Sequence, residues 1–390
     1  MGEASRRWRL VSGGFVLGSI LLVLIVGFWN PGGAFAPEPW PTPTPTSWPR
    51  QRLPAPDYGM QAFLWWNWDI AERDLTLIEE AGFTWVKQNV VWRDLEGILE
   101  GHFDWPKSDY IVERAEAHGL NVLFRIDGLP LPDWTTPPDD PTLPVRPEDF
   151  AHFCGALAER YRGRVRAYQV WNEPNLAREW NDAVPNAAGY VQILRACYVA
   201  IKEADPDAIV ISAGLAPTGT GPPGAIPDVQ YLIEMYEAGA LPYFDLLGLH
   251  APGYRAPPEL SPAEAAADTY YGGQRFFCFR HVEDMREIMV RYGDADKQVA
   301  ILEMGWTTDP HNSAYTWFSV TEEEKADYLV RAFQFARQNW QPWIGPMFVL
   351  SLPDPAWLPE QEQYWWAIAE PGWPEANLRP AYYALRDMDK

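Results

Sequence analysis

Short apolar runs alternate with longer stretches whose apolar residues recur three and four positions apart, from residue 58 to the C-terminus. The short runs are typical of buried parallel strands, and the longer stretches are typical of helices that cover them. Eight strands are predicted at 58–64, 83–88, 121–126, 165–171, 208–213, 244–250, 298–303 and 345–350. Eight β/α units are the number that closes a barrel, so the pattern predicts an α/β fold, a (β/α)8 TIM barrel, over residues 57–390.

Two local signals bear on this fold. Thr321 followed by Glu324 matches a capping box, which predicts that the seventh helix begins there. A doubly wound open sheet is the alternative arrangement of the same elements. We find no glycine-rich phosphate loop after the first strand, so the barrel is favoured.

The N-terminus has a different character. Arg6, Arg7 and Arg9 precede an uncharged run over residues 10–29, which is long enough to cross a bilayer as a helix. We therefore predict a short basic cytoplasmic segment at 1–9 and a single-pass membrane anchor at 10–29, with the rest outside. Residues 34–36 resemble a signal-peptidase site, but Pro37 follows directly, so secretion after cleavage is the alternative. Residues 30–56 are rich in proline and threonine and are predicted to form an extended linker.

The net charge and the cysteine content limit which partners and cofactors the protein is expected to bind. The net charge of −22 disfavours nucleic acid, because it repels phosphate backbones. Cys154, Cys197 and Cys278 show no metal-binding spacing, so no metal or other cofactor is expected, and at most one disulfide can form. The 21 tryptophans supply flat apolar faces that can pack in a core or stack on sugar rings. The sequence gives no indication of oligomeric state.

Polar and aromatic residues gather where the predicted strands end. Barrel enzymes carry their chemistry at the carboxyl ends of the strands, whereas the barrel interior is apolar. The candidates at these ends are Trp66, Lys87, Arg125, Asn172, Glu173, His250, Tyr254, Glu303, Trp306 and Trp365. Glu173 and Glu303 stand out because glycoside hydrolysis needs two carboxyl groups. One group protonates the leaving oxygen, and the other attacks or activates water.

Two motifs resemble a known group. Residues 168–176 read Tyr-Gln-Val-Trp-Asn-Glu-Pro-Asn-Leu, and this string resembles the strand-four signature of the clan A glycoside hydrolases. Residues 300–306, Ala-Ile-Leu-Glu-Met-Gly-Trp, resemble the strand-seven segment of that clan. The nearest families are 39, which includes β-xylosidases, and 5, which includes cellulases. The resemblance implies a retaining enzyme in which Glu173 is the acid/base and Glu303 is the nucleophile.

The resemblance also assigns neighbouring roles. Asn172 would bind the sugar 2-hydroxyl, and His250 and Tyr254 would lie near the nucleophile. Lys87 stands where many clan members have an arginine, and Arg125 is expected to make either an inward ion pair or a substrate contact. Trp66, Trp306 and Trp365 are candidate stacking residues. Strand eight lacks the tryptophan that often ends it, so Trp365 or Trp366 would replace it.

The mechanism sets requirements for the two carboxyl groups. Glu303 is expected to be ionised, and the pKa of Glu173 is expected to be raised by the nearby charge of Glu303. Two alternatives use the same residues: a non-catalytic carbohydrate-binding barrel and a transglycosylase. A metal-dependent hydrolase is disfavoured because His250 is the one histidine predicted at a strand end. Which sugar is bound, and whether attack is exo or endo, stay open.

Overall fold

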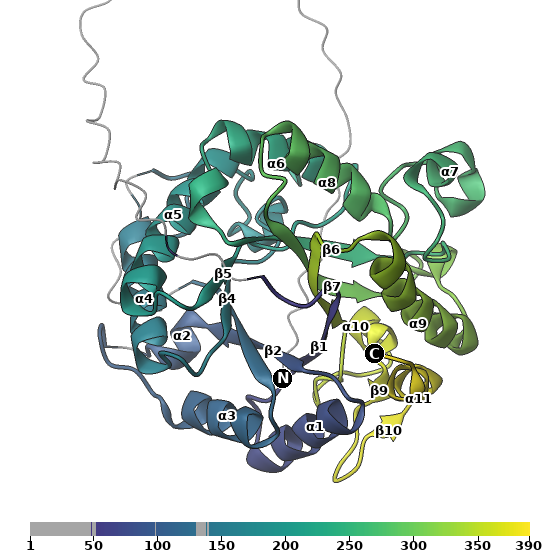
Figure 1. Cartoon of the computed structure of the whole chain (residues 1–390), viewed down its shortest axis with the longest axis horizontal. Helices are drawn as coiled ribbons and strands as arrows, with labels where there is room; N and C mark the ends of the chain where they lie inside the picture. The colour runs from purple at the N-terminus through teal and green to yellow at the C-terminus, as the bar shows by residue number, and fades with distance from the viewer. Residues whose placement is uncertain (1–47, 49–51, 98, 130–137, 139) are drawn as a thin grey trace, which may run out of the picture. The chain divides into compact units, whose positions relative to one another are not determined.

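Eight parallel strands close into a barrel in chain order, and helices surround it (Figure 1). The computed structural model describes residues 48, 52–97, 99–129, 138 and 140–390. The strands are β1 (Asp57–Ala62), β2 (Trp85–Val91), β3 (Asn121–Asp127), β4 (Ala167–Val170), β5 (Ile209–Ile211), β6 (Leu246–Pro252), β7 (Gln298–Gly305) and β8 (Ile344–Val349). The predicted TIM barrel is confirmed, and each observed strand overlaps its predicted range.

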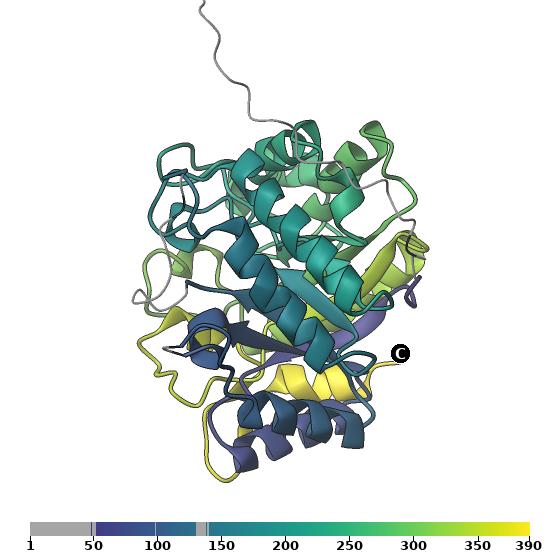
Figure 2. The same cartoon turned by 90° about the vertical axis from the view of Figure 1, so that its left-hand side faces the viewer.

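The helices follow the strands and lie outside them (Figure 2). They are α1 (Trp68–Glu80), α2 (Trp92–Leu95), α3 (Pro106–Ala117), α4 (Pro147–Arg160), α5 (Ala187–Ala204), α6 (Asp228–Glu237), α7 (Pro262–Ala267), α8 (His281–Arg291), α9 (Glu322–Asn339), α10 (Glu362–Trp366) and α11 (Pro380–Asp387). The capping box of Thr321 and Glu324 is present at the start of α9, as predicted. A two-stranded sheet of β9 (Ala369–Glu370) and β10 (Asn377–Leu378) precedes α11.

The barrel interior is a packed apolar core. Trp85, Leu123, Leu302 and Phe348 are among its members, and all are at most 1% exposed. Gly59 makes room for Phe348, because a Cβ at position 59 would lie 2.4 Å from the Phe348 ring. The interior is therefore closed, and a ligand can enter only at an end of the barrel.

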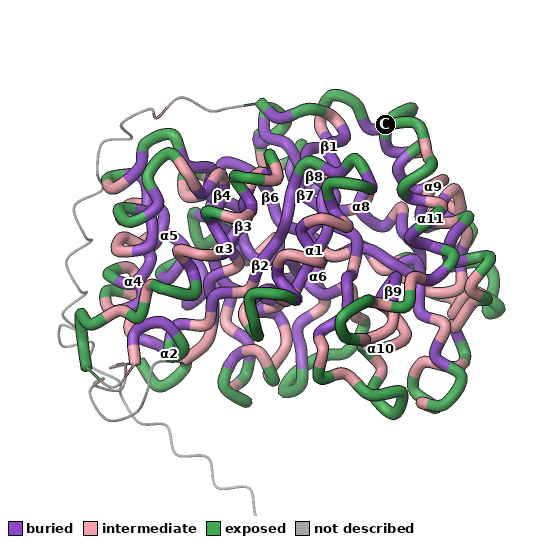
Figure 3. The backbone as a smooth tube through the Cα atoms, turned by 90° about the horizontal axis from the view of Figure 1, so that it is seen from below, coloured by how far each residue is buried: buried purple, intermediate pink, exposed green. Residues whose placement is uncertain are grey.

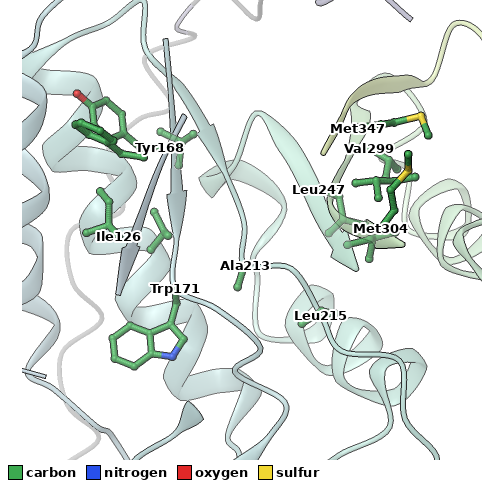
Figure 4. Close-up of a cluster of buried hydrophobic side chains, with 14 of the residues drawn as sticks. Ile126, Tyr168, Trp171, Ala213, Leu215, Leu247, Val299, Met304 and Met347 are labelled. Carbon is green, nitrogen blue, oxygen red and sulfur yellow. The ribbon is translucent and has the colours of Figure 1, made fainter. Parts of the chain in front are cut away.

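A second and larger core lies between the strands and the helices. Figure 3 shows that the buried segments follow the strands and the inner faces of the helices. Figure 4 shows part of this core, including Ile126, Tyr168, Leu247 and Met347. These two cores hold the carboxyl ends of the strands in fixed positions, and those ends carry the candidate site.

The compact unit extends from Ser47 to Lys390, so it begins before the predicted boundary at residue 57. Leu53 was assigned to the linker but is buried, and its backbone N–H donates to Oε1 of Gln298 at 2.9 Å. This segment closes one end of the barrel interior, where Leu53 joins the same apolar cluster as Trp85.

The predicted anchor at 10–29 and the linker up to residue 47 lie outside the described residues. Across residues 48, 52–97, 99–129, 138 and 140–390, no helix combines the length and hydropathy that crossing a bilayer requires.

Candidate active site

The backbone after β4 aims Glu173 into the mouth of the barrel. Trp171 and Glu173 adopt left-handed conformations, with φ of 70° and 40°. Such conformations cost roughly 1–3 kcal/mol each for non-glycine residues and cluster at functional sites. The neighbouring chain holds the segment in place: Asn172 bridges to Gly214, and the Glu173 N–H donates to the Gly214 carbonyl at 3.0 Å. Pairing across the sheet thus fixes the direction of the Glu173 side chain.

A register shift between β6 and β7 sets His250 opposite Glu303. The shift falls between Leu249 and His250, and irregularities of this kind often re-aim a side chain beside an active site. Nδ1 of His250 lies 3.0 Å from Oε1 of Glu173 and 3.7 Å from Oε2 of Glu303. Donor atoms of His250 and the two glutamates all lie within 4.8 Å of one another. Folding therefore brings the two carboxylates, distant in sequence, to face one another across a small gap.

A buried lysine and a partly buried arginine lie beside Glu303. Nζ of Lys87 is 3.1 Å from Oε1 of Glu303, and Nη1 of Arg125 is 3.5 Å from the same oxygen. Burial opposes ionisation of Glu303, but the charges of His250, Lys87 and Arg125 outweigh it and lower its pKa to about 2. Burial also lowers the pKa of Lys87 to about 8, although Glu303 favours the charged ammonium. The environment of Glu303 thus matches the expectation that this carboxylate is ionised.

The pKa of Glu173 is shifted in the direction opposite to the one predicted from the sequence. Burial and the charge of Glu303 favour its neutral form, but the hydrogen bond from His250 and the charges of His250 and Arg178 outweigh them, so its pKa is lowered rather than raised. Oε1 faces His250, and Oε2 accepts a hydrogen bond from Nη2 of Arg178 at 2.8 Å. The prediction of a raised pKa rests on the charge of Glu303 and on burial, and it is wrong because His250 and Arg178 also contact the carboxylate.

The two glutamates line a cavity of about 490 Å³ at the barrel mouth. A cavity of this size can hold one or two sugar rings. Its other lining residues include Arg178, Pro217, Thr218, His250, Tyr254, Tyr315, Phe318, Leu350, Glu362 and Trp366. The wall is thus a mixture of aromatic and charged side chains.

The remaining predicted residues fall into two groups. Tyr254 lines the cavity, and its hydroxyl donates to the Pro217 carbonyl at 3.3 Å. Asn172 lies beside Glu173 but is buried, and its Oδ1 accepts a hydrogen bond from Gln169 at 3.4 Å. Lys87 and Arg125 lie beneath the cavity and contact Glu303 instead of lining the wall.

The predicted tryptophans lie elsewhere. Trp306 is 0% exposed, and its indole N–H donates to the Ala256 carbonyl at 2.9 Å, so it is a core residue and not a stacking surface. Trp66 is exposed in a separate hollow, and its indole bonds to Asp354. The Trp365 indole bonds to the Pro359 carbonyl, and the neighbouring Trp366 lines the cavity. Of the two candidates after strand eight, Trp366 therefore occupies the wall.

The polar lining residues that sequence reasoning missed include Arg178, Tyr315 and Glu362. Arg178 follows Glu173 by five positions in the loop after β4, and an arginine so close to a candidate acid was an available signal. Tyr315 lies in the segment after β7, Glu362 begins α10 after β8, and no spacing rule links them to the glutamates. Only the path of those segments in space brings them to the cavity.

The site also offers donor atoms for a metal ion. Glu173, His250 and Glu303 are the group of this kind found in the part of the chain that the structure describes. Arg178, Lys87 and Arg125 already contact the two carboxylates of that group. Their positive charges oppose a bound cation, so the donor set fits a metal poorly.

Comparisons with known proteins agree with this architecture. No family model and no curated protein sequence matches the chain. Among solved structures, a family 39 glycoside hydrolase from the gut symbiont Bacteroides cellulosilyticus WH2 has a TM-score of 0.60 and 20% identity, over 85% of this chain and 62% of that one. The chain thus spans about three fifths of the length of that structure.

Two further solved structures match along nearly their full length. XacCel5A in complex with cellopentaose has a TM-score of 0.54 and 12% identity, over 86% of this chain and 98% of that one. A GH10 endoxylanase retrieved from a sugarcane soil metagenome has a TM-score of 0.53 and 15% identity, over 85% and 96%. The fold is therefore a glycosidase-like TIM barrel, consistent with the clan A resemblance of the two motifs. At these identities the matches establish the fold alone.

Proposed function

We propose that the protein is a retaining glycoside hydrolase that cleaves β-glycosidic bonds in oligo- or polysaccharides. The observation that carries this proposal is the approach of Glu173 and Glu303, which line one cavity and have one carboxylate oxygen each within 4.8 Å of the other. Retaining enzymes hold their carboxyl groups roughly 5–5.5 Å apart, whereas inverting enzymes need roughly 6.5–9.5 Å to admit a water. The short separation favours direct attack by one carboxylate.

The surroundings of the two glutamates support a different role for each. Glu303 contacts Lys87 and Arg125, so its carboxylate is ionised and available to attack the anomeric carbon. Glu173 instead contacts Arg178, a cation whose side chain is 66% exposed. This difference, together with the strand-four motif around Glu173, supports Glu173 as the group that protonates the leaving oxygen. Positioned proton transfer of this kind contributes roughly a hundred- to ten-thousand-fold in rate.

For Glu173 to carry a proton, Arg178 must first move away from its carboxylate. Arg178 donates to Oε2 and His250 lies 3.0 Å from Oε1, and both contacts favour the ionised carboxylate over the protonated acid in the resting site. Binding of a leaving-group sugar displaces the exposed Arg178 and excludes water, and both effects favour the neutral acid. Once Glu303 is esterified its charge is gone, and Glu173 acts as the base that activates water.

The test is a substrate screen with isosteric variants. Wild-type protein is assayed on aryl β-xylosides, glucosides, galactosides and mannosides and on polysaccharides, and the first-formed anomer is identified by proton NMR. We expect retention of configuration, and a loss of roughly a hundred-fold or more in kcat for Glu173→Gln and Glu303→Gln on substrates with poor leaving groups. Glu362→Gln is the matched control, because Glu362 lines the same cavity outside the pair.

Each contrary outcome has a distinct meaning. Inversion would refute the nucleophile role of Glu303. Saturable binding without turnover would identify the non-catalytic carbohydrate-binding barrel. Transfer of the glycosyl group to an added sugar in preference to water would identify a transglycosylase, which shares the covalent intermediate.

We also propose that the enzyme acts outside the cytoplasm, held at the cell membrane by residues 10–29 on the Pro/Thr-rich linker. The basic residues that precede this apolar run support that orientation. Membrane fractionation with protease treatment of intact cells tests it. Full-length protein in the membrane fraction, digested from outside, is the expected result, and release of a shortened soluble chain would indicate cleavage instead.

A further inference from the structure

Two of the three cysteines meet between neighbouring helices. Cys154 lies on α4 and Cys197 on α5, and these helices pack side by side against the barrel (Figures 1 and 2). Both side chains are 0% exposed. Their Sγ atoms lie 2.7 Å apart. The two residues are 43 positions apart in sequence, so only the fold creates this contact.

The approach is too close for two thiols that merely pack. Carbon atoms in optimal contact lie roughly 3.5–4.0 Å apart, and sulfur is larger than carbon. A disulfide has a sulfur–sulfur distance of roughly 2.05 Å, so a shift of less than an ångström separates the observed pair from a covalent bond. The backbones of α4 and α5 therefore already hold the two side chains where a disulfide would join them.

We propose that Cys154 and Cys197 form a disulfide that joins α4 to α5 in the folded protein. The proposal does not depend on glycosidase activity. It does bear on the site, because the closed loop contains β4, Glu173 and Arg178. The two helices that flank the acid/base segment are thereby tied to each other on the outside of the barrel.

The bond forms by exchange with an external protein disulfide, the class of oxidant present where exported proteins fold. One cysteine thiolate attacks a sulfur of the oxidant, which releases the other sulfur as a thiolate and leaves a mixed disulfide. The second cysteine thiolate then attacks the first cysteine sulfur, and the mixed disulfide breaks. The oxidant departs as a dithiol that carries the two electrons and the two protons.

This exchange takes place during folding, before α4 and α5 pack against each other. In the folded chain both sulfurs are buried, and burial raises the pKa of the Cys197 thiol well above its ordinary range. A buried neutral thiol is a poor nucleophile, and a protein oxidant cannot reach it. Once formed, the bond is protected from reduction for the same reason.

Cys278 provides an internal comparison. It is buried in a separate small cluster, its thiol donates to the Arg275 carbonyl at 3.4 Å, and burial raises its pKa to about 12. It is not paired with a sulfur among the described residues. The oxidised chain therefore keeps one thiol, at position 278.

The first experiment counts thiols in the full chain after export into an oxidising compartment. The protein is unfolded in an alkylating agent, with and without prior reduction, and its intact mass is measured. We expect one alkylated cysteine without reduction and three after it, with a peptide linkage between 154 and 197 on mapping. Three alkylated cysteines without reduction, or a linkage that includes Cys278, would overturn the proposal.

The second experiment measures the melting temperature. Reduction should lower the value for wild type and for Cys278→Ala by about 4 °C, and it should leave Cys154→Ala, Cys197→Ala and the double variant unchanged. The wild-type comparison needs no variant, so it holds even if an alanine substitution prevents folding. If mass measurement verifies the reduction and the melting temperature of the wild type does not change, the disulfide does not stabilise the fold. Because neither readout uses substrate, an inactive protein would leave both results intact.

Discussion

Arg178 donates a hydrogen bond from Nη2 to Oε2 of Glu173 at 2.8 Å, on the solvent side of the candidate acid. The side chain of Arg178 is 66% exposed, whereas that of Glu173 is 14% exposed. An exposed cation therefore stabilises the ionised form of a nearly buried carboxyl group. The contact couples the protonation of Glu173 to whatever occupies the cavity beside Arg178.

Replacing Arg178 tests this coupling. Arg178→Gln removes a positive charge, so the pKa of Glu173 should rise. The alkaline limb of kcat/KM reports the essential acid of the free enzyme, and it should therefore move to higher pH. Arg164→Gln is the matched control, because Arg164 pairs with Glu116 on the surface away from the cavity. An alkaline limb that does not move in Arg178→Gln would contradict the role of Glu173 as the acid.

Replacing Lys87 should change the acidic limb of the pH profile of kcat/KM. Lys87→Met removes a buried cation 3.1 Å from Glu303, so the pKa of Glu303 should rise from about 2. Glu303 must be ionised to attack, and the acidic limb of kcat/KM should move to higher pH as a result. Lys202→Met provides the control for loss of a buried ion pair, because Lys202 pairs with Asp245 at 2.7 Å. If the control shifts the acidic limb equally, the effect comes from the fold and not from Glu303.

Gly214 should control the position of His250. A Cβ at residue 214 would lie 2.2 Å from Nε2 of His250, so Gly214→Ala must displace the ring from its position between the two glutamates. A displacement near 1 Å in an active site can cost about a hundred-fold in rate, and we expect a loss of roughly ten- to a hundred-fold in kcat/KM. Gly221→Ala is the control, because no atom lies within 4 Å of a Cβ there. Full activity of Gly214→Ala would show that His250 does not position Glu173.

A buried histidine away from the cavity should make stability depend on pH. Nε2 of His281 lies 2.8 Å from Asp228, and Nδ1 lies 3.0 Å from Asp284. Burial opposes the charge on His281, but the hydrogen bonds to the two aspartates outweigh it and raise its pKa to about 9. The ordinary pKa of histidine is roughly 6.5, so the shift corresponds to about 3 kcal/mol of stability at low pH.

The sign of the effect follows from the raised pKa. The contribution of His281 is complete below the unfolded value of roughly 6.5 and is lost as the pH rises through about 9. The difference in unfolding free energy between wild type and His281→Asn should therefore shrink between pH 6 and pH 9.5, measured by denaturant unfolding. A difference that is constant with pH would mean that His281 is neutral in the folded protein.

The sequence by itself determined the architecture and the candidate glutamates. The alternation of apolar runs with amphipathic stretches predicts the eight strands, because burial on both faces of a parallel sheet imposes a local pattern on each strand. Glu173 and Glu303 could be found because each lies in a short motif at a strand end. The capping box of Thr321 and Glu324 was also readable, since its contacts span only three residues.

Tertiary structure decided the rest, because the deciding contacts join residues far apart in sequence. Trp306 and Trp366 are the same residue type after neighbouring strands, yet one is core and the other lines the cavity. The β6–β7 register shift places His250 against both glutamates, and the loop after β4 returns Arg178 to Glu173. The pKa of Glu173 depends on these contacts, and a sum of charges over distances cannot be computed until folding has fixed the distances.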